Sequence, residues 1–280
     1  MAQNATVSIQ LFASGYCEAH AYVVNPLEGK RKTSFYAVWA LIHIPHIGYV
    51  LFDTGYSEAF QLATKYFPER FYRWATPIQL ESSETAKSII ESQNIQIKEI
   101  KYIIISHFHA DHIAGLKDFP DAKFICSKSA YEQVMNLHGI KAVSKGILHK
   151  LIPDNFNLRV QFIEDFADVV SINEFGMTVF ELFGINEYKL VLLPGHAKGM
   201  LGFIYIKENE SILYATDASW SYDTYSRGIL PMQIVKLFFD SWSDFVETQQ
   251  KIRAFELSNQ HCTILFTHCK QTLALIANVL

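Results

Sequence analysis

The chain has 280 residues, of which 50% are apolar, so it can bury a sizeable hydrophobic core. Its formal net charge is only −4 and it carries no long basic run, so nucleic acid is not expected as a partner. No stretch approaches the ~18 apolar residues of a membrane helix, and no signal-peptide pattern opens the chain. The four cysteines follow neither a disulfide framework nor a CxxC pattern. We therefore expect a cytoplasmic protein with no membrane partner.

Short β-type runs and helical patterns alternate along the chain. Turn residues bound most of the predicted strands, which cover residues 7–12, 35–43, 49–52, 101–106, 123–126, 178–183, 189–193, 202–206, 211–215 and 263–267. Helical spacing predicts helices over 84–93, 129–137 and 240–257. Strands that alternate with helices in this way predict an α/β sandwich.

No linker rich in proline, glycine or serine divides the chain, so we expect one domain over residues 1–280. Two stretches, around 56–80 and 134–175, have the character of insertions, which are often functional when they are this long. The first carries a run of aromatic residues from Tyr56 to Trp74. These residues either pack a helix onto the core or form the wall of a substrate pocket, and exposed ones would suit a homodimer contact.

A dense polar cluster follows the predicted strand 101–106 and contains His107, His109, Asp111 and His112. Residues two apart in an extended segment point the same way, so His107 and His109 can converge on one point. Asp111 and His112 come a turn later and can converge on a second point nearby. Imidazoles suit zinc, and a carboxylate adds a hard oxygen ligand. The cluster therefore predicts metal binding.

Three further residues each follow a predicted strand, where α/β folds collect their sites: His196, Asp217 and His268. Alone, each would more often be an ordinary turn or surface residue. Beside the cluster they become candidate ligands. The seven candidates then divide between two ions as three histidines, one aspartate with two histidines, and one shared aspartate.

Five motifs occur in a fixed order: Leu-Phe-Asp-Thr-Gly at 51–55, Ser-His-Phe-His-Ala-Asp-His-Ile-Ala-Gly at 106–115, Pro-Gly-His at 194–196, Thr-Asp at 216–217 and Thr-His at 267–268. In this order they resemble the metallo-β-lactamase superfamily, and the match covers most of the chain. The resemblance implies an αββα sandwich of two mixed β-sheets flanked by helices, with a dinuclear site at one edge.

The resemblance also implies the ligand sets. It places the first metal on His107, His109 and His196, and the second on Asp111, His112 and His268, with Asp217 as the bridge between them. Asp53 would orient a ligand histidine. The implied cofactors are two divalent metal ions, with Zn²⁺ as the default.

Within the superfamily the chain is most similar to the N-acyl-homoserine lactonases, which quench bacterial quorum signalling. True β-lactamases generally lack an aspartate at the Asp217 position, and glyoxalase II places a glutathione-binding domain after the residue matching His268, where only a short stretch follows here. One departure is Trp220, which stands where lactonases have a tyrosine that contacts the substrate carbonyl. We expect Tyr222 to supply this catalytic role; the alternatives are that Tyr225 supplies it or that the role is absent. We expect Phe67, Trp220 and Tyr225 to line the substrate pocket.

The resemblance implies that a metal-bridging hydroxide opens the lactone ring of a small-molecule N-acyl-homoserine lactone, with Asp111 and Asp217 assisting proton movement. An aromatic wall would favour longer acyl chains, because each buried methylene contributes about 0.8 kcal/mol. One alternative is a dinuclear-metal hydrolase of another ester or of a phosphodiester, since the same site suits attack at phosphorus. A second alternative is a non-catalytic, metal-dependent binding protein.

Overall fold

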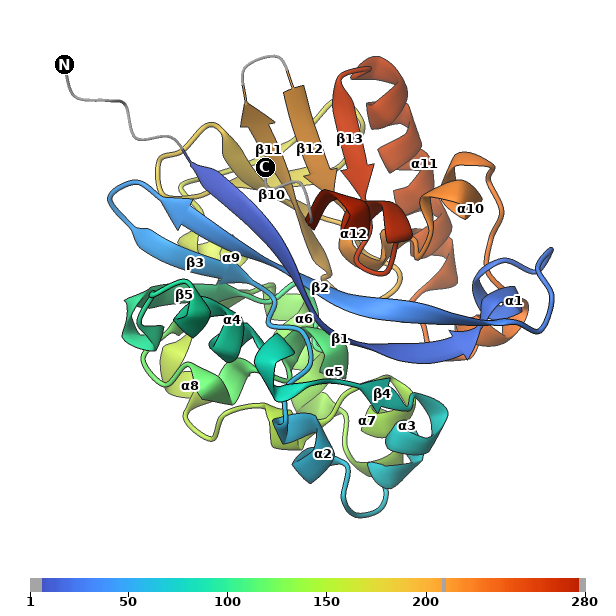
Figure 1. The fold of residues 1–280 in the computed structure, drawn as a ribbon. Coiled ribbons are helices and arrows are strands. Elements are labelled where there is room, and N and C mark those ends of the chain that lie inside the picture. Colours follow the sequence, from blue (N-terminus) through green and yellow to red (C-terminus); the bar gives the residue numbers. More distant parts are fainter. Residues whose placement is uncertain (1–6, 208–209, 277–280) are drawn as a thin grey trace.

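Two β-sheets pack face to face in the computed structural model, which describes residues 7–207 and 210–276 (Figure 1). Within these residues the first sheet has seven strands in the order β4-β1-β2-β3-β5-β6-β7. They are β1 (Ser8–His20), β2 (Lys32–Ile44), β3 (Gly48–Phe52), β4 (Ile78–Gln79), β5 (Ile100–Ile104), β6 (Lys123–Cys126) and β7 (Val160–Phe162).

The second sheet has six strands in the described part of the chain, in the order β13-β12-β11-β10-β9-β8. They are β8 (Val169–Ile172), β9 (Thr178–Glu181), β10 (Tyr188–Leu192), β11 (Leu201–Lys207), β12 (Glu210–Tyr214) and β13 (Cys262–Leu265). Both sheets are mixed, because β3, β5, β6 and β7 run parallel in one and β12 and β13 in the other, while the remaining pairs are antiparallel.

Helices cover the outer faces of the two sheets (Figure 1). The helices on the side of the first sheet are α2 (Ala59–Ala63), α3 (Arg70–Ala75), α4 (Ala86–Ser92), α5 (Ala110–Ile113), α6 (Lys128–Asn136), α7 (Gly139–Ser144) and α8 (Phe156–Arg159). The long helix α11 (Trp242–Ser258) covers the second sheet. The remaining helices are α1 (Ala21–Val24), α9 (Ile163–Phe166), α10 (Tyr222–Ser226) and α12 (Lys270–Ile276). The predicted αββα sandwich of two mixed sheets is confirmed.

Three apolar clusters separate the layers. One lies between the first sheet and its helices and contains Leu51, Phe60 and Ile103. The second fills the space between the sheets and contains Phe52 and Phe203, whose ring centroids are 5.1 Å apart. The third joins the second sheet to α11 and includes fully buried Ile252 of that helix. Because side chains alternate along each strand, each sheet has one face in the cluster between the sheets and the other face in the cluster beneath its helices.

All ten predicted strands have a counterpart in the structure, with bounds shifted by a few residues. The largest difference is the hairpin of β1 and β2, which is longer than predicted and has a register shift between Ala13 and Tyr16. Three strands were not predicted: β4, β7 and β8. They are two to four residues long, and β8 is exposed along its length, so the sequence carries no buried face to signal it.

The predicted helices 129–137 and 240–257 correspond to α6 and α11. The helix predicted over 84–93 starts later than expected, because Ser82–Glu84 form a separate 3₁₀ turn. Helix α4 follows this turn. Thr85 caps α4, since its hydroxyl accepts from the backbone N–H of Ser88. Other 3₁₀ turns cover Ile97–Glu99, Leu116–Asp118, His149–Leu151, Thr216–Ala218 and Gln233–Leu237. None of the helices in the described part of the chain has the length and apolar character needed to span a bilayer.

Candidate metal centre

The seven ligands predicted from the sequence lie together at one edge of the sandwich. His107 follows β5, and the loop it opens leads through His109 into α5 with Asp111 and His112. The other three follow strands of the second sheet, namely β10, β12 and β13. The centre therefore forms only where the two sheets meet.

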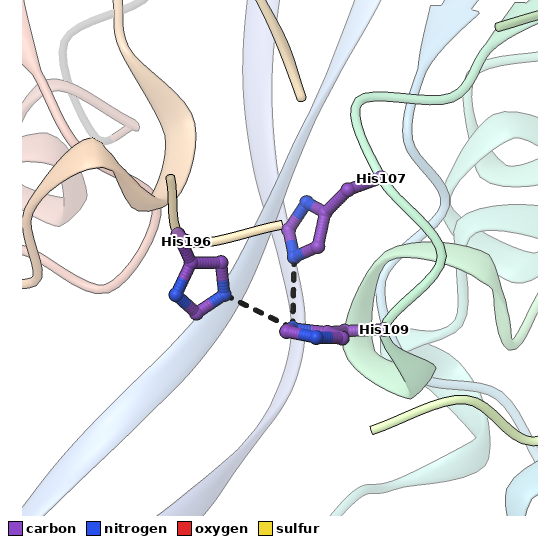
Figure 2. A group of neighbouring side chains, drawn as sticks. All are labelled: His107, His109 and His196. Carbon is purple, nitrogen blue, oxygen red and sulfur yellow. Dashed lines mark hydrogen bonds between the residues drawn. The ribbon is translucent and has the colours of Figure 1, made fainter. Parts of the chain in front are cut away.

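The first group of candidate ligands consists of three histidines, His107, His109 and His196. The Nδ1 atom of His109 lies 3.0 Å from the Nε2 atom of His107 and 3.0 Å from the Nε2 atom of His196 (Figure 2). Figure 2 shows that His107 and His109 come from one side of the centre and His196 from the other. Three ring nitrogens thus point at one small volume.

The second group consists of Asp111, His112 and His268. The Oδ2 atom of Asp111 lies 3.5 Å from the Nε2 atom of His112 and 3.4 Å from the Nε2 atom of His268. The side chain of His112 is fully buried and the other two are nearly so. This group joins a carboxylate of α5 to a histidine near the start of α12.

Asp217 lies between the two groups. Its Oδ2 atom is 3.3 Å from the Nε2 atom of His196 and 3.2 Å from that of His268, and its Oδ1 atom is 3.7 Å from that of His112. One carboxylate is therefore within reach of both groups, which is the position that a bridging ligand needs.

The donor set fits divalent metal ions. The Nε2 atom of His112 and the Oδ1 atom of Asp217 are buried and have no hydrogen-bond partner among the described residues. A buried polar atom without a partner costs about 1–3 kcal/mol, and coordination of a cation would remove that cost. Imidazole nitrogens with carboxylate oxygens are the usual ligands of zinc and neighbouring transition metals.

Burial and neighbouring charges shift the pKa values of the histidines in this centre in opposite directions. Burial, reinforced by the other imidazoles, lowers the pKa of His107 and of His196 well below the usual range, so both rings are neutral and ready to coordinate. Burial opposes a charge on His112 as well, but the surrounding carboxylates, led by Asp111, raise its pKa well above the usual value.

Asp217 shows the complementary shift. Burial would raise its pKa, but the rings of His268 and His112 outweigh burial and hold the pKa well below its usual range. Before a metal ion binds, protons on these imidazoles would balance the carboxylates. A metal cation would take their place, so its binding would release protons.

Asp53, at the end of β3, holds His112. Its Oδ2 atom lies 2.7 Å from the Nδ1 atom of His112, so the Nε2 atom of that ring faces the centre. Asp53 also accepts from the backbone N–H of Ser106 through Oδ1 and from the Ser106 hydroxyl through Oδ2, each at 2.7 Å. Ser106 was not predicted as a site residue. Its only sequence signal is a polar side chain between an apolar strand and the first ligand.

The ring of His268 is held by the backbone of the first sheet. The Nδ1 atom of His268 lies 2.8 Å from the backbone oxygen of Tyr36 in β2. Such partners choose the tautomer and the orientation of a ligand histidine.

The comparisons with known proteins agree with this geometry. The family model described as Metallo-beta-lactamase superfamily matches residues 37–250, which is most of the chain. The chain belongs to the metallo-beta-lactamase superfamily.

Similar members of the superfamily include N-acyl homoserine lactonase AttM of Agrobacterium fabrum, 26% identical over 158 residues that make up 56% of this chain and 54% of that protein. The N-acyl homoserine lactonase AiiA of Bacillus thuringiensis subsp. kurstaki is 24% identical over 213 residues, 76% of each chain. The match thus spans about half the length of AttM and three quarters of AiiA.

Solved structures of the superfamily share the fold. One is an N-acyl homoserine lactone hydrolase with the product N-hexanoyl-L-homoserine bound at its catalytic metal centre, with a TM-score of 0.73, 16% identity and 95% of both chains covered. Another is AidC, a dizinc quorum-quenching lactonase, with a TM-score of 0.64, 14% identity, and coverage of 96% of this chain and 89% of that one.

Trp220 borders the centre of this superfamily member. Its ring centroid lies 5.8 Å from that of His196 and 6.3 Å from that of Phe35. Trp220, Phe35 and His268 line a cavity of about 290 Å³, which continues between α1 and α10. Phe35 was not predicted as a site residue, because it is one of many apolar residues in a predicted strand.

Tyr222 and Tyr225 do not point at the metal centre. The hydroxyl of Tyr222 donates to the Oε1 atom of Glu256 at 2.6 Å, and that of Tyr225 donates to its Oε2 atom at 3.1 Å. Both rings pack in the cluster beneath α11. This geometry argues against a catalytic role for Tyr222 and a pocket role for Tyr225, because α10 turns both side chains toward α11.

The aromatic stretch 56–74 divides into two sets. Tyr56 and Phe60 are buried in the core, as expected if they pack a helix onto the sheet. Phe67, by contrast, is 55% exposed and contacts Phe71 and Trp74, with ring centroids 4.9 Å and 5.4 Å apart. We call Phe67, Phe71 and Trp74 the α3 aromatic cluster.

Proposed function

We propose that this chain is a metal-dependent hydrolase that opens the lactone ring of N-acyl-homoserine lactones. The observation that carries the proposal is the position of Asp217 between two ligand groups beside a cavity with apolar walls. Its relatives AttM and AiiA are N-acyl homoserine lactonases, which supports this substrate class.

The ligand groups would hold two ions, which we propose to be Zn²⁺. When bound, two such ions act as Lewis acids and make hydroxide available at neutral pH. The chain itself supplies the geometry: Asp53 and the backbone of Tyr36 fix the rings of His112 and His268.

The two carboxylates of the centre would serve different purposes. The side chain of Asp217 is 3% exposed and contacts histidines of both groups, so it acts chiefly as a ligand. The side chain of Asp111 is 10% exposed, so it is more open to a bound substrate than that of Asp217. We propose that Asp111 takes the proton of the reacting water and returns it to the departing alkoxide.

The cavity beside His268 would receive the part of the substrate that does not react. Its volume is close to the lower limit of ordinary small-molecule sites, which is about 300 Å³. Phe35, Trp220 and Val24 offer apolar walls, and each buried methylene contributes about 0.8 kcal/mol, so we propose a preference for longer acyl chains. The Trp220 indole has one N–H to donate to a carbonyl but no proton to exchange.

The test is lactone hydrolysis by metal-analysed protein, with N-acyl-homoserine lactones of short, medium and long acyl chains. Activity should rise with chain length, and His109→Ala should lose metal and at least about 100-fold in activity. His261→Ala, at an exposed histidine outside the centre, is the matched control. Aryl esters and phosphodiesters are measured beside the lactones. Activity confined to either of these, or full activity in His109→Ala, would contradict the proposal.

We also propose that a second copy of the chain covers the α3 aromatic cluster. Its three rings are 51–59% exposed, and contact with an identical surface across a two-fold axis would bury them. Phe71→Ser should shift the protein toward monomer in sedimentation velocity, whereas Leu158→Ser, at an exposed leucine of α8, should not. A wild-type monomer at high concentration would rule out the dimer.

A further inference from the structure

The turn after α7 is joined to a distant loop next to the first ligand group. The ammonium of Lys145 donates to the backbone oxygen of Leu237 at 3.2 Å and to that of Phe239 at 2.5 Å. Nearby, the side-chain amide of Gln133 in α6 donates to the carboxylate of Asp240. Two side chains from the first half of the molecule thus hold residues 237–240 of the second half.

Residues 237–240 in turn hold His196. The ring of Phe239 is 2% exposed and lies 4.9 Å from the ring of His196, centroid to centroid. The backbone N–H of Asp240 donates to the backbone oxygen of His196 at 3.2 Å, and that of Ser241 donates to Gly195 at 3.0 Å. The position of His196 therefore depends on where this loop is held.

The segment around Lys145 also frames His109. Ile147 forms a β-bridge with His109, and Gly146 lies so close that an added Cβ would be 2.6 Å from the His109 ring. The backbone of this segment thus borders one ligand while its lysine side chain reaches the loop that borders another.

We propose that Lys145 is a positioning residue that sets the spacing between His109 and His196. These ligands come from opposite sides of the centre (Figure 2), so their spacing depends on how the two halves of the sandwich dock. A lysine suits this position because its long stem spans the gap and its ammonium has three donors for backbone carbonyls. The inference concerns metal binding and does not depend on which substrate is hydrolysed.

Lys145→Met tests the proposal, because it keeps most of the stem and the backbone carbonyl but removes the donors. Both Zn²⁺ affinities of the full-length chain are measured by competition with a chromogenic chelator. His109→Ala and His268→Ala, which each remove one ligand from a different group, assign the two affinities. We expect Lys145→Met to weaken the affinity of the three-histidine group by about 10–100-fold and to leave the other nearly unchanged.

Two further variants serve as controls for Lys145→Met. Lys145→Arg, which keeps the donors, should recover most of the lost affinity. Lys141→Met, at an exposed lysine in the preceding helix α7, should bind both ions as the wild type does. Unchanged affinities in Lys145→Met would overturn the proposal. An equal loss at both groups with a lower melting temperature would also overturn it, because it indicates a general structural role. If Lys145→Met does not fold, Gln133→Ala is measured in the same way, and an unchanged three-histidine affinity there decides against the proposal.

Discussion

Asp53 follows the buried strand β3 with a φ of +62°, a backbone conformation that aspartate and asparagine tolerate better than most residues. Its carboxylate is fully buried and contacts three donors on Ser106 and His112. One side chain therefore joins the end of β3 to the end of β5 and orients a ligand ring. Its value to the centre lies in these contacts, since Asp53 does not itself belong to either ligand group.

Asp53→Asn should weaken metal binding at the group that contains His112 by about 10–100-fold and lower the free energy of unfolding by about 1–3 kcal/mol. Asparagine keeps the shape and tolerates the backbone conformation, but its amide nitrogen cannot accept from Ser106 or His112. Chelator competition and urea unfolding measure the two effects. Ser106→Ala, which keeps the backbone donor, should have a smaller effect, and the reverse order would disprove this account of Asp53.

Tyr222→Phe and Tyr225→Phe should leave lactone hydrolysis nearly unchanged. Each variant loses a hydroxyl that donates to Glu256, so the free energy of unfolding should fall by about 1 kcal/mol. Steady-state kinetics and urea unfolding check both statements. A fall in kcat of about 100-fold in Tyr222→Phe, the size of a general acid–base contribution, would restore its expected catalytic role.

At the scale of elements, the centre depends on how α11 docks against the turn that carries His196. The hydroxyl of Thr248 donates to the backbone oxygen of Pro194 at 2.7 Å, and Ser241 caps α11 by accepting from the backbone N–H of Asp244. Gly195 between them has a φ of +129°. A Cβ there would lie 2.1 Å from the backbone nitrogen of Phe245, so only glycine permits this approach.

Gly195→Ala should lower the free energy of unfolding by about 3–5 kcal/mol, because overpacking against a backbone adds to conformational strain. Zinc affinity should fall with it, since His196 must move. Gly184→Ala is the matched control, because its φ is also positive at +63° but nothing lies within 4 Å of the added Cβ. It should cost only about 1–2 kcal/mol, and equal losses in urea unfolding would show that the α11 contact is unimportant.

At the scale of the whole molecule, the metal centre is a junction between the two sheets. Four ligands belong to the segment after β5, and three follow strands of the second sheet. Each of the two ligand groups combines residues from both sides, so a cation bound at either group stabilises the docking of the halves. It binds the folded chain alone, because the unfolded chain does not bring these residues together.

Removal of metal should lower the melting temperature. At a free metal concentration of 100 times the dissociation constant, each ion stabilises the fold by about 2.7 kcal/mol. For a chain of this size that corresponds to roughly 4–6 °C for each ion. Differential scanning calorimetry of chelated and zinc-loaded protein measures the shift. Equal melting temperatures would mean that the centre does not couple the sheets.

The sequence by itself determined ten of the thirteen described strands, the sandwich and the seven candidate ligands. Period-two alternation and apolar runs are local signals, and polar residues placed directly after such runs gather at a sheet edge whatever the loops do. His107 to His112 could be recognised for this reason. Asp217 and His268 needed the same rule together with the cluster, because each alone resembles an ordinary turn or surface residue.

Only the tertiary structure decided which neighbouring side chains face the centre. Tyr222 follows Asp217 closely in the sequence, yet α10 turns its hydroxyl to Glu256 in α11. Lys145 and Phe239 carry no local signal, and they meet next to His196 because two distant segments dock there. Strand ends are set by local spacing, whereas the direction of a side chain in a loop depends on the remote surface against which that loop packs.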